Sequence, residues 1–126
     1  MKYLRIAISA VVLVIMMAGC SGESKEEVVA RLVSDSEGHY QIHLFYQDMT
    51  ELDNELLAYW NSEQELLELI QGIQLYDVEI QNNQEIADTL GLESYPSMVV
   101  TDDQEVILET KDMAEVQGYF DRLLEG

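Results

Sequence analysis

The sequence predicts one α/β domain, with a central mixed sheet of about four strands and helices on both faces, behind a short N-terminal targeting segment. Helical and strand-like patterns alternate along the chain, which favours parallel strand pairs joined by right-handed crossovers. The 107 residues from position 20 onward are enough for one domain at the small end of the usual range. No internal repeat or low-complexity tract suggests a different architecture.

The first twenty residues have a different composition from the rest of the chain. They contain Lys2 and Arg5 and no acidic residue, followed by an apolar run over residues 6–19. A membrane-spanning helix needs about 20 apolar residues. A secretory leader needs only about 7–15, behind a basic start and before a small-residue cleavage site. The pattern therefore predicts a leader over residues 1–19.

The end of that run carries a more specific signal. Met17-Ala18-Gly19-Cys20 resembles the lipobox of bacterial lipoproteins, with Met17 where the motif usually has Leu. The resemblance implies that the Cys20 thiol takes a diacylglycerol, often joined by further acylation at the new N-terminus, and that the chain is cut before it. Several acyl chains anchor a protein firmly, because each buried CH2 contributes about 0.8 kcal/mol. We expect an acylated cysteine and polar tether over residues 20–25, a domain over residues 26–126, and a lipid-anchored location on the extracytoplasmic face of the cell membrane.

Charge and cysteine content exclude several classes of function. The chain has 25 acidic and 6 basic residues and a net charge of −19; only four basic residues follow Cys20, so that part carries −21. Such a surface does not suit nucleic acid, whose phosphates need a cationic face. A single cysteine excludes an internal disulfide framework, a CxxC pair and a thiolate-rich zinc site. With only two histidines as well, we expect no metal site and no cofactor.

In the first half of the domain, a capping box over residues 24–27 predicts a helix with one apolar face. Residues 39–46 alternate and are rich in β-formers, which predicts a strand. A helix is expected over residues 47–59. A second capping box at residues 62–65 predicts another helix, which continues to Gly72.

The second half of the domain continues the alternation. Gly91 is expected to close a short helix at its C-terminus. The expected elements, in order, are a strand over residues 73–80, a helix over residues 84–90, a hairpin of strands over residues 97–101 and 105–109, and a final helix over residues 113–124.

Two segments carry a resemblance to a known family. Residues 77–100 are similar to the thioredoxin pattern of a strand ending in acidic residues, a short helix and a turn through Tyr95-Pro96-Ser97 into a strand. Residues 44–47, Leu-Phe-Tyr-Gln, resemble the strand that precedes the family's active site. The resemblance implies a thioredoxin-like fold over residues 26–126 and a cis peptide bond before Pro96, the chain's only proline.

The family's central chemistry is missing from this sequence. Thr50-Glu51-Leu52-Asp53 falls where the catalytic CxxC should stand, and neither Thr50 nor Asp53 is a thiol. Thiol–disulfide exchange needs a thiolate nucleophile and a resolving sulfur, so oxidoreductase activity is not expected. Thr50 is predicted to be the N-cap of the next helix, with Asp53 three positions on. The resemblance also implies a candidate peptide-binding groove formed by Thr50, Asp53, Tyr95 and Pro96.

Other candidate residues have structural explanations that we prefer. His39 and His43 lie too far apart on one strand to share an ion easily, and we expect surface or partly buried positions for both. The acidic residues Asp102, Asp103 and Glu105 lack the spacing of a calcium loop, and a solvated hairpin turn is expected there.

Three functions remain open on the sequence. The first, which we favour, is a redox-inactive thioredoxin-like module that binds an extracytoplasmic protein or peptide. The second is a non-redox enzyme that uses carboxylates such as Asp48, Asp53 or Asp77, which requires environments that separate their pKa values. The third is a structural envelope lipoprotein near peptidoglycan. The sequence predicts no oligomeric state.

Overall fold

The computed structural model describes residues 24–48 and 50–126. The predicted leader, the lipobox with Cys20 and most of the predicted tether lie outside these residues. Within the described part of the chain, no helix has both the length and the apolar character needed to cross a bilayer.

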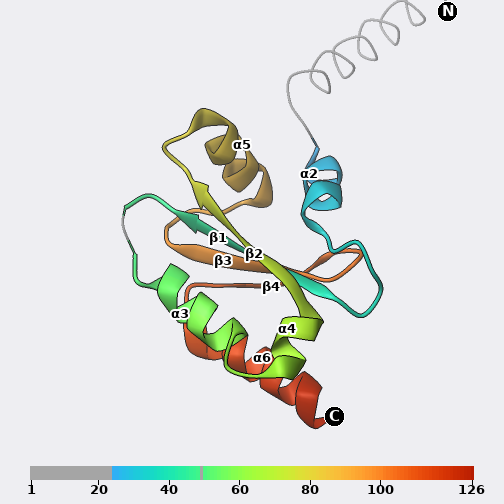
Figure 1. The fold of residues 1–126 in the computed structure, drawn as a ribbon. Helices are drawn as coiled ribbons and strands as arrows, with labels where there is room; N and C mark the ends of the chain where they lie inside the picture. Colours follow the sequence, from blue (N-terminus) through green and yellow to red (C-terminus); the bar gives the residue numbers. More distant parts are fainter. Residues whose placement is uncertain (1–23, 49) are drawn as a thin grey trace, which may run out of the picture.

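The described residues form a four-stranded mixed sheet between helices (Figure 1). The strand order is β2-β1-β3-β4, in which β1 pairs in parallel with β2 and antiparallel with β3, and β3 and β4 form an antiparallel hairpin. This arrangement confirms the predicted α/β class and strand number. The elements are α2 (Lys25–Leu32), β1 (Tyr40–Tyr46), α3 (Leu52–Trp60), α4 (Gln64–Leu69), β2 (Ile70–Asp77), α5 (Gln81–Leu90), β3 (Ser97–Thr101), β4 (Val106–Thr110) and α6 (Met113–Glu125).

Helices cover both faces of the sheet, as the sequence predicts. In Figure 1, α2 and α5 lie on one side of the sheet and α3 and α6 on the other. Because side chains alternate along a strand, the central strand β1 contributes to two hydrophobic cores. Phe45 belongs to the core beneath α2 and α5, and Ile42 and Leu44 belong to the core beneath α3 and α6.

Several predicted local signals are confirmed. The Ser24 hydroxyl accepts the Glu27 N–H at the start of α2, which is the serine half of a capping box. Gly91 ends α5 with φ +83°, a left-handed conformation that glycine adopts without steric cost. The Tyr95–Pro96 peptide bond is cis. Asp102 Oδ1 accepts the N–H groups of Gln104 and Glu105, so this carboxylate stabilises the hairpin turn.

The second predicted capping box is wrong. The N-cap of α4 is Glu63, which makes no side-chain capping bond. The Ser62 hydroxyl instead donates to the Tyr59 carbonyl at the end of the preceding helix α3, at 2.6 Å. The Ser62 hydroxyl therefore bonds a carbonyl at the end of one helix and does not cap the next.

The predicted bounds around β2 are also wrong. The strand covers Ile70–Asp77 and not residues 73–80, because the parallel ladder with β1 already pairs Tyr40 with Ile70. Beyond Asp77 the chain turns, with the Ile80 N–H donating to the Asp77 carbonyl, and α5 begins three residues earlier than predicted. In the same way, α3 begins at Leu52 and not at Gln47.

Candidate functional site

The start of α3 lies just beyond the end of β1, where the sequence places the candidate site. The N-cap of α3 is Glu51, one residue later than predicted, and its side chain makes no capping bond. The Thr50 hydroxyl accepts the Leu52 N–H at 3.1 Å. Thr50 thus satisfies one free N–H of the helix from just outside it, because a Thr hydroxyl can bond two residues ahead as well as three.

Thr50 and Asp53 share one hollow, of about 170 Å³, with Tyr46 from β1 and Leu75 from β2. Asp53 Oδ1 is shielded from solvent and accepts no hydrogen bond from any residue that the structure describes. A shielded carboxylate oxygen without a donor is unfavourable, since its desolvation is not compensated. The hollow can therefore accept a donor, and a cationic donor best of all.

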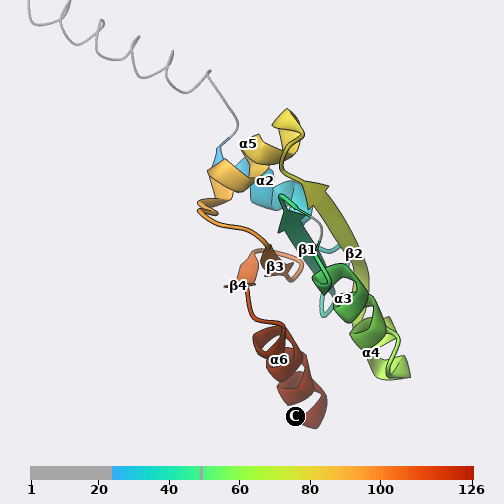
Figure 2. The ribbon, with the colours of Figure 1, turned by 90° about the vertical axis from the view of Figure 1, so that its left-hand side faces the viewer.

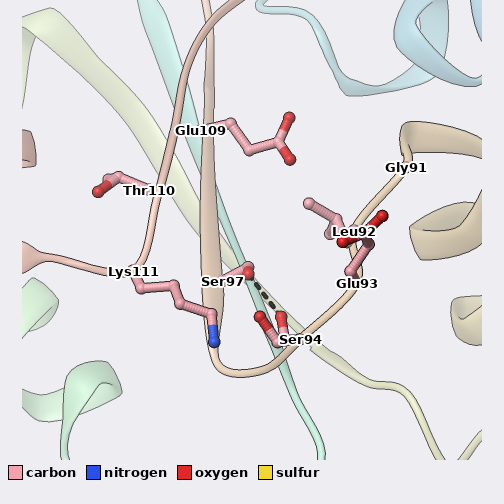
Figure 3. Close-up of a pocket in the computed structure, with 8 residues that line it drawn as sticks. All are labelled: Gly91, Leu92, Glu93, Ser94, Ser97, Glu109, Thr110 and Lys111. Carbon is pink, nitrogen blue, oxygen red and sulfur yellow. Dashed lines mark hydrogen bonds between the residues drawn. The ribbon is translucent and has the colours of Figure 1, made fainter.

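The turn through Pro96 lies beside a second hollow, of about 230 Å³ (Figure 3). Ser97, the first residue of β3, donates its hydroxyl to the Ser94 carbonyl at 2.7 Å, which ties the turn together across the proline. Among the described residues that line it, Lys111 is the one cation, and Glu93 and Glu109 also line the hollow. The mixed charges do not favour one ligand class.

The four predicted groove residues are only partly brought together. Thr50 and Asp53 line the same hollow, whereas Tyr95 and Pro96 line neither of the two hollows described above. Leu75 was not predicted. In the sequence, Leu75 stands directly before Tyr76 in a predicted strand. Successive strand residues point to opposite faces, so this pair makes both faces of the strand apolar, and that is the signal for Leu75.

The other aromatic candidates have structural roles. The Trp60 indole N–H donates to the Ile70 carbonyl at 3.0 Å, which ties α3 to the start of β2. The Tyr59 hydroxyl donates to Asp121 Oδ1 at 2.9 Å and so links α3 to α6. Partial burial, together with this hydrogen bond, raises the pKa of Tyr59. Neither residue lines the hollow at Asp53.

The predicted surface or partly buried position of His43 is wrong, because its side chain is fully buried, with only 1% exposed. Nε2 lies 2.8 Å from the Leu32 carbonyl, so it carries the proton and donates it. Nδ1 lies 2.8 Å from the Tyr76 hydroxyl oxygen, which also lies 2.6 Å from Gln74 Oε1. Burial lowers the pKa of His43 to about 4, partly offset by the bond to Leu32, and burial raises that of Tyr76 to about 12.

Of the carboxylates named for acid–base chemistry, Asp53 lines the hollow at the start of α3, and Asp48 and Asp77 do not. No group of three or more potential ligand side chains gathers within residues 24–48 and 50–126. Among the described residues that line the hollow at the start of α3, Asp53 is the sole carboxylate. Asp77 Oδ1 accepts the Glu79 N–H in the turn after β2. A mechanism that divides acid and base roles between two carboxylates needs a second carboxylate beside Asp53. None of the described residues that line this hollow supplies one.

Similar solved structures identify the architecture. The chain matches Chlamydomonas reinhardtii thioredoxin f2 with a TM-score of 0.55 and 11% identity, over 80% of this chain and 93% of that one. It matches mitochondrial thioredoxin 3 from Saccharomyces cerevisiae with a TM-score of 0.51 and 15% identity, over 73% and 85% of the two chains. This chain has a thioredoxin-like fold. A third match is the thioredoxin of Malassezia sympodialis, with a TM-score of 0.50 and 14% identity over 69% and 76%.

The thioredoxin-like fold is here combined with a sequence that contains a single cysteine and hence no CxxC motif. That cysteine, Cys20, lies outside the described residues. No protein-family model matches the chain, and no curated protein matches it either. At these low identities the solved structures establish the fold alone.

Proposed function

We propose that this chain is a lipid-anchored thioredoxin-like domain on the extracytoplasmic side of a cell membrane, which acts by binding a protein or peptide and not by thiol chemistry. The observation that carries the proposal is the thioredoxin-like fold with Thr50 and Asp53 at the start of α3, where the family's two cysteines would stand. A hollow with a shielded carboxylate oxygen replaces a redox centre there.

The lipid anchor is supported by the sequence from Met17 to Cys20 and by the basic and apolar residues before it. A free domain with a net charge near −21 would be repelled by anionic lipid headgroups. Covalent acyl chains hold such a domain at the membrane in spite of that repulsion.

Replacing Cys20 is expected to abolish lipid attachment. In bacterial cells fed an alkyne-tagged fatty acid, the wild-type chain should become labelled and be recovered with membranes, whereas Cys20→Ala should show labelling at background. Ser21→Ala, which keeps the thiol, is the matched control and should be labelled like the wild type. Equal labelling of the Cys20→Ala variant would refute the anchor.

Installing two thiols at the start of α3 is expected to create redox activity. The acylated wild-type chain in detergent should reduce insulin no faster than dithiothreitol alone. Thr50→Cys/Asp53→Cys should accelerate the reaction about tenfold or more, because thiols at a helix N-terminus have lowered pKa values. Thr50→Cys alone lacks the resolving sulfur and is the control.

The two outcomes of the insulin assay address different statements. Acceleration by the wild-type chain would overturn the proposal that the domain acts without thiol chemistry. An inactive double variant that still folds would show instead that positions 50 and 53 do not reproduce the geometry of the family's cysteine pair.

A further inference from the structure

We propose that the free edge of strand β2 binds an extended, basic segment of a partner protein, which adds a fifth strand to the sheet and places a cationic side chain beside Asp53. This inference deepens the proposed function, on which it rests, by naming the surface and the chemistry of the bound segment. Strand addition supplies affinity through main-chain hydrogen bonds and specificity through pockets for alternate side chains.

Strand β2 is at the margin of the sheet and pairs on one side with β1 (Figure 2). The Val78 N–H, just past the strand, donates to the Tyr46 carbonyl of β1 at 2.9 Å. Since backbone groups alternate in direction along a strand, the N–H and C=O groups of Tyr76 and Gln74 also point toward β1. Those of Ile73 and Leu75 therefore point away from the sheet.

Both ends of this edge already have contacts within the domain. The Asp77 carbonyl accepts the Asn83 side-chain amide at 3.0 Å, and the Gln71 side-chain oxygen Oε1 accepts the Asp35 N–H at 3.0 Å. The open part of the edge is thus the stretch around Ile73 and Leu75, with two donors and two acceptors. These are enough for four hydrogen bonds to an added strand.

The open stretch lacks the usual protection of an edge strand. Natural edges carry charged residues, Pro or bulges that prevent pairing with other chains. Residues 72–76, with the sequence GIQLY, contain no charged residue and no Pro, and Leu75 is 50% exposed. The ladder with β1 has its one register shift between Tyr40 and Gln41, where Gln71 of β2 is skipped, so the irregularity precedes the open stretch. This stretch is suited to accept another strand.

The hollow at the start of α3 lies next to the same edge, because Leu75 belongs to both. In neighbouring strands, side chains directly opposite each other on one face have Cβ atoms about 5 Å apart. A residue added opposite Leu75 on that face would therefore reach the hollow lined by Tyr46, Thr50 and Asp53. Its side chain could donate to the shielded Asp53 Oδ1, which has no other partner among the described residues.

The negative charge of this chain favours a basic segment of another protein as the strand bound at the β2 edge. A second copy of this chain would bring another net charge near −21 against the same edge, which is unfavourable. The chain's own residues 20–23, which remain once the leader is removed, are too few to run along the edge and still join α2 at Lys25. A basic segment of another protein complements both the overall charge and Asp53.

The test uses the full acylated chain in nonionic detergent and a fluorescent peptide of about ten residues with alternating Val and Lys. Fluorescence anisotropy should show binding of this peptide and none of a Val–Glu peptide. The Val–Lys peptide methylated on alternate backbone nitrogens keeps its charge but loses donors to the edge, and should bind about tenfold more weakly.

Two exposed leucines provide matched variants. Leu75→Lys adds a cation at the edge and should weaken binding of the Val–Lys peptide about tenfold, through like-charge repulsion. Leu123→Lys makes the same change on α6, at a side chain 40% exposed, and should weaken it less than about twofold. Asp53→Asn should weaken it about fivefold, through loss of the charge-assisted hydrogen bond.

Hydrogen exchange measured by NMR identifies the mode of binding. The Ile73 and Leu75 amides should exchange rapidly in the free chain and become protected when the Val–Lys peptide is added. Protection of both amides in the free chain would mean that a second copy or another segment of the same chain already covers the edge, and would overturn the inference. Equal binding of the methylated peptide, or no binding at all, would also overturn it, while the lipid-labelling and insulin results for the proposed function would stand.

Discussion

Lowering the pH from 7 to 4 is expected to reduce the free energy of unfolding by about 3 kcal/mol through His43 alone. Burial lowers the pKa of His43 to about 4 in the folded chain, against 6.5 when the side chain is free. Between these values the unfolded chain binds more protons than the folded chain, so acid favours unfolding. The stabilisation from neutral His43 is fully present above pH 6.5 and is lost as the pH falls toward 4.

His43→Leu isolates this contribution from that of the carboxylates. The substitution leaves neighbouring polar groups satisfied, because Thr101 still donates to the Leu32 carbonyl at 2.7 Å and the Tyr76 hydroxyl still contacts Gln74 at 2.6 Å. The free energy of unfolding should be measured in urea between pH 4 and 7. Over that range it should fall by about 3 kcal/mol less in His43→Leu than in the wild type. His39→Leu, at a loop histidine, is the control and should follow the wild type. Parallel curves for His43→Leu and wild type would contradict the role assigned to His43.

Phe45→Ala is expected to destabilise the chain by about 4 kcal/mol, which is a large share of the stability of a domain of this size. Phe45 has no exposed surface, and its ring stacks on Tyr76 at a centroid distance of 4.4 Å and an interplanar angle of 11°. It lies on β1, which pairs with strands on both sides. Truncation leaves a cavity that such a site cannot easily close.

Equilibrium urea unfolding of Phe45→Ala measures this loss directly. Phe45→Leu keeps most of the buried volume and should cost about 1–2 kcal/mol. Leu123→Ala removes a partly exposed side chain from α6 and should cost less than about 1 kcal/mol. A Phe45→Ala variant as stable as Leu123→Ala would show that the core beneath α2 and α5 does not depend on this ring.

The elements with strong local signals were predictable. Gly91 ended a helix because its lack of a side chain permits the left-handed conformation, and Ser24 began one because its hydroxyl reaches the Glu27 N–H. The segment around β2 was not predictable in its bounds. Apolar residues in the segment 66–80 recur at both the helical and the strand spacing. Only pairing with β1 therefore decided that the strand begins at Ile70.

The candidate site was predictable in its residues but not in its environment. Thr50 and Asp53 were identified by their distance from the strand at residues 44–47, and the structure places both in one hollow. Leu75 completes that hollow from a strand more than twenty residues away. The shielding of Asp53 Oδ1 depends on this long-range contact, and no local pattern reports it.

The sequence by itself determined the absence of a CxxC pair, the strongly acidic balance and the alternation of helices and strands, because these depend on composition and local spacing. The tertiary structure decided which strands lie at the edges of the sheet, which histidine is buried and which carboxylate oxygen lacks a donor among the described residues. Each of these depends on strand order and on contacts between residues far apart in the chain. Pairing between distant strands is set by the packing of the whole domain, which short-range periodicity does not encode.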